Sequence, residues 1–264
     1  MRLAYRFAAS AAWLSLMAAV LAIAPLRTSA QDAAPPAAPE AAAAPLKPPA
    51  VFKASGMFSG GTTTSGMVLS GVRFGGEDDY TRMVLDFEQE SASGLLGEAT
   101  AHPVYTIEYY EYPYRLVARM TGVRFSDDAA VQTKNALPFS VVTREDGTIK
   151  ELQIFLAGPS EFKVIEVDDP AKLAIDVRPR DVAIPTVYAV QVAGPTSVSE
   201  AYALVEQGQF PAGFAPMVLV LGGEVVVEQA FTDPEQAAGY DAALREMGYA
   251  CVINERRGDE LPQA

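Results

Sequence analysis

Histidine and cysteine are almost absent from this chain of 264 residues, which has one histidine (His102) and one cysteine (Cys251). A zinc amidase or peptidase that uses two histidines is therefore excluded for this chain, and a Ser-His-Asp site would have to use His102. Because one cysteine cannot form an internal disulfide, stability has to come from core burial even in an oxidising compartment. We interpret His102 as a loop residue and Cys251 as a small core residue of a strand.

Basic residues are also few, with 20 lysines and arginines against 33 acidic residues and a net charge of −13. Nucleic acids and anionic lipid surfaces are bound through clustered lysine and arginine. The composition therefore argues against nucleic acid as a partner, and a membrane is expected only if the N-terminal segment stays attached.

The acidic residues gather in turn-like stretches at 77–79, 127–128 and 168–169, where solvated charge is the ordinary state. We expect no catalytic site, metal site or cofactor there. A glycosidase needs only two carboxylates, so an uncharacterised hydrolase stays open as an alternative.

The first 30 residues have the pattern of a secretory signal peptide. Arg2 and Arg6 precede an uncharged run at 7–24, and small residues lead to a predicted cleavage after Ala30. The run is long enough for an uncleaved inner-membrane anchor to be the alternative. In both cases the sequence predicts a chain that leaves the cytoplasm, and we expect a periplasmic protein.

Residues 31–66 are predicted to be a linker, rich in alanine and proline at first and in glycine, serine and threonine later, with an edge strand near 67–69. Such a composition offers too few large apolar groups to order a chain.

Residues 67–180 are predicted to form an all-β sandwich. Short runs alternate apolar and polar residues, as in Met83, Leu85 and Phe87. The segment also repeats itself: Pro113 matches Pro170 at an offset of 57, and the preceding strands match at an offset of 69. Two equivalent halves with one apolar face each are expected to pack face to face.

Residues 186–255 are predicted to form an α+β domain of order β-α-β-β-α-β, followed by a tail at 256–264. Ser197 and Asp233 are expected to cap the two helices. Both helices should cover one face of the sheet and leave the other face open.

The first of these segments, at 67–180, resembles the AMIN domain, the duplicated β-sandwich found beside cell-wall amidases and pilus secretins. The resemblance rests on the strand at 80–87, on the Tyr-Pro-Tyr-Arg-Leu-Val run at 112–117 and on the run at 173–177 that closes the second half. It implies a domain that docks on the cell wall or on envelope proteins.

The second segment, at 186–255, resembles the SPOR domain, which binds peptidoglycan glycan strands stripped of their stem peptides. The residues behind this are the runs at 188–192, 229–237 and 243–249. Alternation along the first strand turns Gln191 away from Val190 and Val192 and toward the open face. Amides and aromatic rings are the groups that bind sugars, so Gln191, Gln229 and Phe231 are the candidate glycan-binding residues.

Together these features predict a non-catalytic protein of the Gram-negative cell envelope that binds peptidoglycan, together with amidase or divisome partners at the division site. The alternative is an assembly factor of a pilus or secretin-type machine, in which the SPOR-like domain is vestigial.

Overall fold

The computed structural model describes residues 50–132, 137–143 and 147–263. The predicted signal peptide (1–30) and the first part of the predicted linker (31–49) lie outside these residues. Within the part that is described, no helix is both long enough and apolar enough to cross a membrane.

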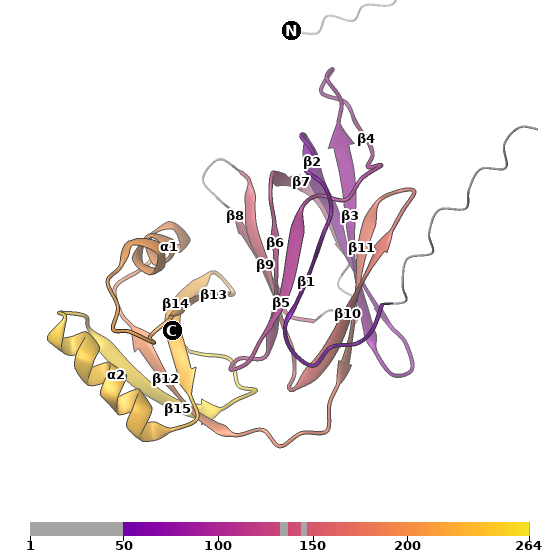
Figure 1. Ribbon diagram of the computed structural model, residues 1–264. Coiled ribbons are helices and arrows are strands. Elements are labelled where there is room, and N and C mark those ends of the chain that lie inside the picture. Colours follow the sequence, from indigo (N-terminus) through magenta and orange to yellow (C-terminus); the bar gives the residue numbers. More distant parts are fainter. Residues whose placement is uncertain (1–49, 133–136, 144–146, 264) are drawn as a thin grey trace, which may run out of the picture. The chain divides into compact units, whose positions relative to one another are not determined.

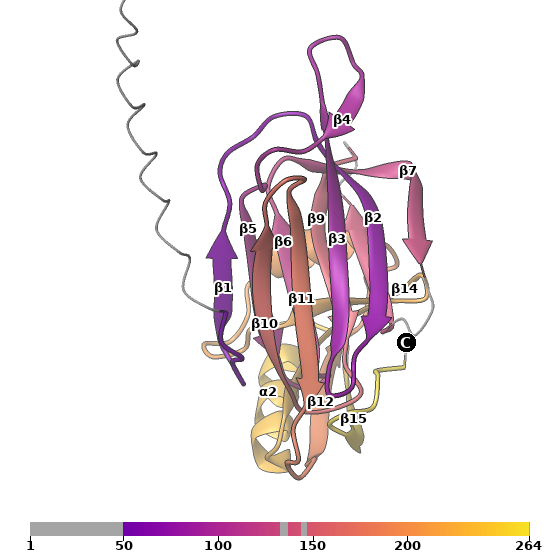
Figure 2. The same ribbon diagram turned by 90° about the vertical axis from the view of Figure 1, so that its right-hand side faces the viewer.

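The β-rich architecture predicted for residues 67–180 is confirmed, as two sheets that pack face to face (Figures 1 and 2). The five-strand sheet has the order β1-β5-β6-β9-β8, with β1 at Met57–Gly60, β5 at Tyr105–Tyr110, β6 at Arg115–Met120, β9 at Ile149–Phe155 and β8 at Phe139–Thr143. The six-strand sheet has the order β10-β11-β3-β2-β7, with β10 at Ser160–Val167, β11 at Lys172–Pro179, β3 at Thr81–Glu90, β2 at Met67–Gly76, β7 at Val123–Gln132, and β4 at Leu96–Glu98 paired with β3. Only β2 and β7 pair in parallel among these strands.

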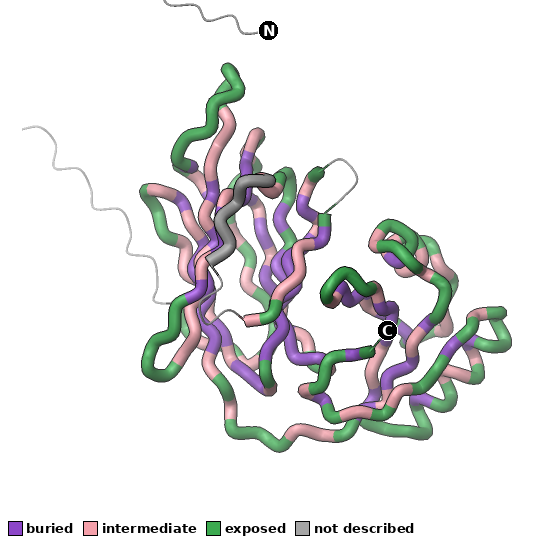
Figure 3. Tube along the Cα trace, turned by 180° about the vertical axis from the view of Figure 1, so that it is seen from behind, coloured by how far each residue is buried: buried purple, intermediate pink, exposed green. Residues whose placement is uncertain are grey.

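The core of this sandwich is formed by the inward-facing residues of both sheets. Leu85, Leu116, Ile154, Phe162 and Leu173 are fully buried in one apolar cluster. Figure 3 shows the buried stretches gathered where the two sheets face each other. The period-two alternation of the sequence therefore does position the core.

The sequence repeat corresponds to an equivalence of strand register. Adding 57 to the residues of β6 gives 172–177, which lie in β11, and subtracting 69 from the last six residues of β9 gives 81–86, which lie in β3. The partners Arg115 and Phe155 then become Lys172 and Asp86, which are also partners, and the other pairs of the β6–β9 ladder transform in the same way. Strands β6 and β9 are therefore equivalent to β11 and β3 residue by residue along this ladder.

The two halves also exchange strands. The hairpin β5–β6 of the first half pairs with β9 of the second half, and the hairpin β10–β11 of the second half pairs with β3 of the first. Each sheet therefore contains both halves, and neither half has a complete sheet of its own.

The predicted linker ends earlier than residue 66. Residues 57–60 form β1, which extends the five-strand sheet by pairing with β5. The edge strand expected near 67–69 is the start of β2, which runs for 10 residues. Composition missed β1 because backbone pairing to a sheet edge needs no apolar run.

The C-terminal part has the predicted order β-α-β-β-α-β. Its elements are β12 (Thr186–Val192), α1 (Val198–Gln207), β13 (Met217–Leu221), β14 (Glu224–Phe231), α2 (Pro234–Glu246) and β15 (Cys251–Arg257). They form the C-terminal sheet, of order β13-β14-β12-β15, and both helices pack on one face of it through residues such as Ala201 and Leu244. Ser197 and Asp233 cap the helices as predicted, accepting hydrogen bonds from the backbone amides of Glu200 and Glu235.

The predicted tail begins inside the last strand, because Arg256 and Arg257 belong to β15. The chain then folds back along the sheet: the amide of Gly258 donates to the carbonyl of Pro185 (2.8 Å), and Pro262 is buried. The C-terminal residues are thus part of the folded module.

Candidate functional site

The face of the C-terminal sheet opposite the helices carries Gln191, as the sequence predicts. Val190 and Val192 are buried under the helices, while the side chain of Gln191 lies on the other face. Its amide nitrogen donates to Oε2 of Glu228 (3.0 Å) and to the carbonyl of Gln263 (3.4 Å). Gln191 is therefore held by both the sheet and the tail.

The other two predicted glycan-binding residues lie on the helix face. The register pairs Gln229 with Val190 and Phe231 with Tyr188, and directly paired residues point to the same side of a sheet. Phe231 is buried and stacks on Tyr240, with ring centroids 5.1 Å apart. The structure therefore does not bring the three candidate residues together: Gln229 and Phe231 lie on the opposite face from Gln191, and Phe231 is a core residue.

Gln229 has a local structural contact. Its Oε1 accepts a hydrogen bond from the backbone amide of Ala215 (2.5 Å), which fixes the segment that leads into β13. The sequence runs that contain Gln229 and Phe231 indicate the helix-side packing of the module.

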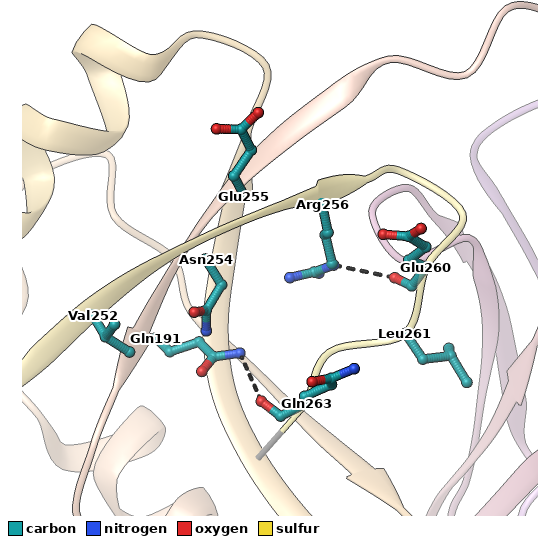
Figure 4. A pocket seen from close by; sticks show the side chains of 8 residues that line it. All are labelled: Gln191, Val252, Asn254, Glu255, Arg256, Glu260, Leu261 and Gln263. Atoms are coloured by element: carbon teal, nitrogen blue, oxygen red, sulfur yellow. Dashed lines mark hydrogen bonds between the residues drawn. The ribbon is translucent and has the colours of Figure 1, made fainter.

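A cavity of about 910 Å³ opens beside Gln191 (Figure 4). Its walls come from β12, from β15 and from the tail, with Gln191, Val252, Asn254, Glu255, Arg256, Glu260, Leu261 and Gln263 lining it. Amide groups and carboxylates dominate this lining, and Val252 and Leu261 add apolar surface. Such a surface can exchange hydrogen bonds with hydroxyl and acetamido groups, and apolar patches can cover sugar rings.

One lining residue of the cavity, Arg256, forms a buried ion pair with Glu228. Arg256 Nη2 lies 2.5 Å from Glu228 Oε1, and the two side chains are 7% and 1% exposed. Gln191 donates to the second oxygen of the same carboxylate. Because these groups satisfy each other, they position Gln191 beside the amide of Asn254.

The same face is covered along β13 and β14, which contradicts the predicted open face. Leu219 and Val226 are buried there in one cluster with Phe155, an outward-facing residue of β9 in the five-strand sheet. The sequence did not predict this contact, because alternation places Phe155 on the outer face but does not indicate which residues pack against it. An outward aromatic residue in a strand was the available signal.

Arg115 lies at this contact with only 1% of its surface exposed. Its guanidinium donates to the carbonyl of Pro113 (3.1 Å) and to the thioether of Met217 (2.7 Å), which is a weak acceptor. Nε has no hydrogen-bond partner among the described residues. Burial outweighs the attraction of Glu151 and Glu228 and lowers the pKa of Arg115 to about 10.

The remaining candidates for chemistry are engaged in structure. His102 Nε2 lies 3.0 Å from the carbonyl oxygen of Val167, in a buried position between the two halves of the sandwich. Cys251 is buried, and burial raises the pKa of its thiol. In the part of the chain that the structure describes, no group of three or more histidine, cysteine or acidic side chains is arranged to hold a metal ion.

Comparisons with protein-family models, with curated proteins and with solved structures give no match for this chain.

Proposed function

We propose that this is a non-catalytic protein of the periplasm that binds peptidoglycan glycan strands through the cavity beside Gln191 and Asn254. The observation that carries the proposal is the position of this amide-rich cavity. It lies on the helix-free face of a β-α-β-β-α-β module, the face that the resemblance of residues 186–255 to SPOR domains assigns to glycan. The resemblance of residues 67–180 to AMIN domains gives the sandwich an envelope role as well, with amidase or divisome proteins as partners.

Export by residues 1–30 is part of the same proposal, because peptidoglycan lies outside the cytoplasm. The engagement of His102 with Val167 supports the non-catalytic reading, since a general base needs a ring nitrogen that reaches a substrate. We propose no cofactor.

Binding to purified sacculi, before and after amidase treatment, tests the proposal. We expect enrichment on amidase-treated sacculi, and we expect the double variant Gln191→Ala with Asn254→Ala to lose most of it. The matched control is Gln229→Ala, which removes a partly buried amide from the helix face of the same module. Retention by wild-type protein that is equal to that of an unrelated acidic protein would refute glycan binding.

A second candidate function is favoured by the covered part of the sheet face. If the C-terminal module serves only to pack on the sandwich, the protein is an assembly factor of a pilus or secretin-type machine, and its AMIN-like part docks a protein. A tagged copy at the cell poles would favour this function, and a tagged copy at midcell would favour the first.

A further inference from the structure

The outer face of the five-strand sheet and the helix-free face of the C-terminal sheet bury each other. Phe155 is 2% exposed, and its partners Leu219 and Val226 are 0% and 5% exposed. An outward phenylalanine on one sheet and an outward leucine on another are thus removed from water together. Burial of this apolar surface favours the docked arrangement.

The exposed edge of β13 is closed by side chains instead of a further strand. Gln153 of β9 donates from Nε2 to the carbonyl of Val218 (2.8 Å), and its Oε1 accepts from the amide of Val220 (3.1 Å). Ser140 of β8 donates from Oγ to the carbonyl of Val220 (2.5 Å). One glutamine side chain therefore takes the place of a neighbouring strand, which gives the contact a defined register.

Helix α1 adds two polar contacts at the rim. Tyr202 donates its hydroxyl to Glu151, and Lys150 forms an ion pair with Glu206. Glu151 also accepts from Gln153 (2.5 Å), so the rim and the edge of β13 share one carboxylate. These are specific contacts between the two modules, yet most of them are polar and can be replaced by water.

Arg115 makes the docked arrangement costly. A guanidinium that is buried with a thioether, a carbonyl and an unpartnered Nε has lost hydration that its contacts only partly replace. Lys172, which takes the equivalent position in the other half, is 30% exposed and pairs with Asp86. Separation of the modules would return water to Arg115. The contact between the modules is therefore specific in its hydrogen bonds and carries a desolvation cost at Arg115.

We infer that the two modules mask each other's binding faces, and that the C-terminal module holds an extended glycan strand only after it leaves the five-strand sheet. This inference rests on the proposed function and adds its regulation. In the docked arrangement a ligand reaches Gln191, Val252 and Asn254 from the cavity, whereas Leu219, Val226 and Glu228 are buried on the same face. A chain end can enter the cavity, but a strand that crosses the whole sheet has no path.

The sequence repeat suggests a variant that should separate the modules without disturbing the strand pairing of the five-strand sheet. Position 155 is equivalent to Asp86, so Phe155→Asp introduces the residue that the other half carries there and sets a carboxylate opposite Arg115, as Asp86 lies opposite Lys172. Leu219→Asp breaks the contact from the other module. Val84→Asp is the matched control, because it adds one carboxylate to the outer face of the six-strand sheet at the position equivalent to Gln153.

Two measurements on the full chain, with and without these changes, decide the question. Hydrogen exchange of β13 reports whether the modules separate, and binding to amidase-treated sacculi reports glycan affinity. We expect faster exchange in Phe155→Asp and Leu219→Asp and about tenfold tighter binding, the change expected if docked molecules outnumber separated ones by about ten to one. Val84→Asp should leave both unchanged.

Each other outcome has one meaning. If β13 exchanges faster and binding stays at the wild-type level, glycan binding stands and masking is overturned. If β13 exchanges faster and no variant binds glycan, the proposed function itself fails. If neither variant alters exchange of β13, these contacts do not hold the modules together, and masking is again overturned.

Discussion

The outer faces of the two sandwich sheets are built on equivalent backbones and carry different surfaces. On the six-strand sheet, Asp86 pairs with Arg73 (2.5 Å) and with Lys172 (3.3 Å), and all three side chains are partly exposed. On the five-strand sheet, the equivalent of Asp86 is Phe155, which is buried under the C-terminal module. The same register thus supports a solvated charge network on one side and a docking surface on the other.

One ion pair is common to both faces with its signs exchanged. Asp176 lies 2.5 Å from Arg82 on the six-strand sheet, and Arg119, equivalent to Asp176, lies 3.3 Å from Glu151 on the five-strand sheet. The position of the charges follows the register, but Glu151 also holds Gln153 and Tyr202. Equivalent positions thus carry an ion-pair network on one sheet and contacts with the C-terminal module on the other.

The largest effects are expected in the core, where equivalent residues of the two halves should contribute equally to stability. Leu116 and Leu173 are equivalent and both are fully buried. Leu116→Ala and Leu173→Ala should each lower the free energy of unfolding by about 2–5 kcal/mol, because each leaves a cavity between the sheets. Urea denaturation measures the loss in free energy of unfolding for each variant. If the two losses differ by more than about 1.5 kcal/mol, the halves are not energetically equivalent.

A smaller effect is expected at the charge network of the six-strand sheet. Asp176 is fully buried, while Arg82 is a third exposed, so Asp176→Asn should cost about 2 kcal/mol at neutral pH, less than the 3–5 kcal/mol typical of a fully buried pair. Asp78→Asn, in the exposed turn after β2, is the control and should cost nothing measurable. Chemical denaturation of the three proteins side by side gives the values.

The same residue predicts a pH dependence. Burial raises the pKa of Asp176, but hydrogen bonds from Arg82 and Lys163 outweigh burial and the pKa is lowered in the folded protein. A carboxyl with a lowered folded pKa stabilises the fold above its unfolded pKa of about 4, and this contribution is lost as the pH falls through the folded pKa. The difference between wild type and Asp176→Asn should therefore shrink below about pH 4; a difference that is constant from pH 7 to pH 3 would contradict a charge origin.

The smallest effect is expected at the rim of the docking surface. Tyr202→Phe removes the hydrogen bond to Glu151 and should cost about 1 kcal/mol, because Glu151 keeps Gln153 and Arg119 as partners. The change should appear as faster exchange of α1 and β13 with little change in the exchange of β3. If β3 lost as much protection as α1 and β13, Tyr202 would stabilise the whole chain and not the contact alone.

Sequence patterns predicted the core and the order of elements because both depend on local periodicity. Alternation placed Leu85 and Leu173 inside and turned Gln191 to the correct face, and the capping residues Ser197 and Asp233 marked the helix starts. The pairing of strands from different halves could not be predicted from the sequence, because it depends on which sheet edges meet in the folded chain.

The candidate site was predicted in part for the same reason. Phe231 was assigned to the glycan groove because aromatic rings bind sugars, but the register of β14 with β12 places it under the helices. Asn254 lines the same cavity as Gln191 and was not among the predicted residues. The face is also covered by contacts such as that of Gln153 with β13. These contacts join residues that are far apart in the sequence, so no local pattern predicts them.

The amide of Val220 tests the docked arrangement most directly. It lies on the outer edge of β13 and donates to Gln153 Oε1, so its protection from hydrogen exchange depends on the five-strand sheet. We expect slow exchange of this amide in the wild-type chain, loss of its protection in Gln153→Ala and no change in Val84→Ala. Exchange of the Val220 amide in wild type at the rate of an open sheet edge would contradict the docking of the two modules, and with it the proposed masking of the helix-free face.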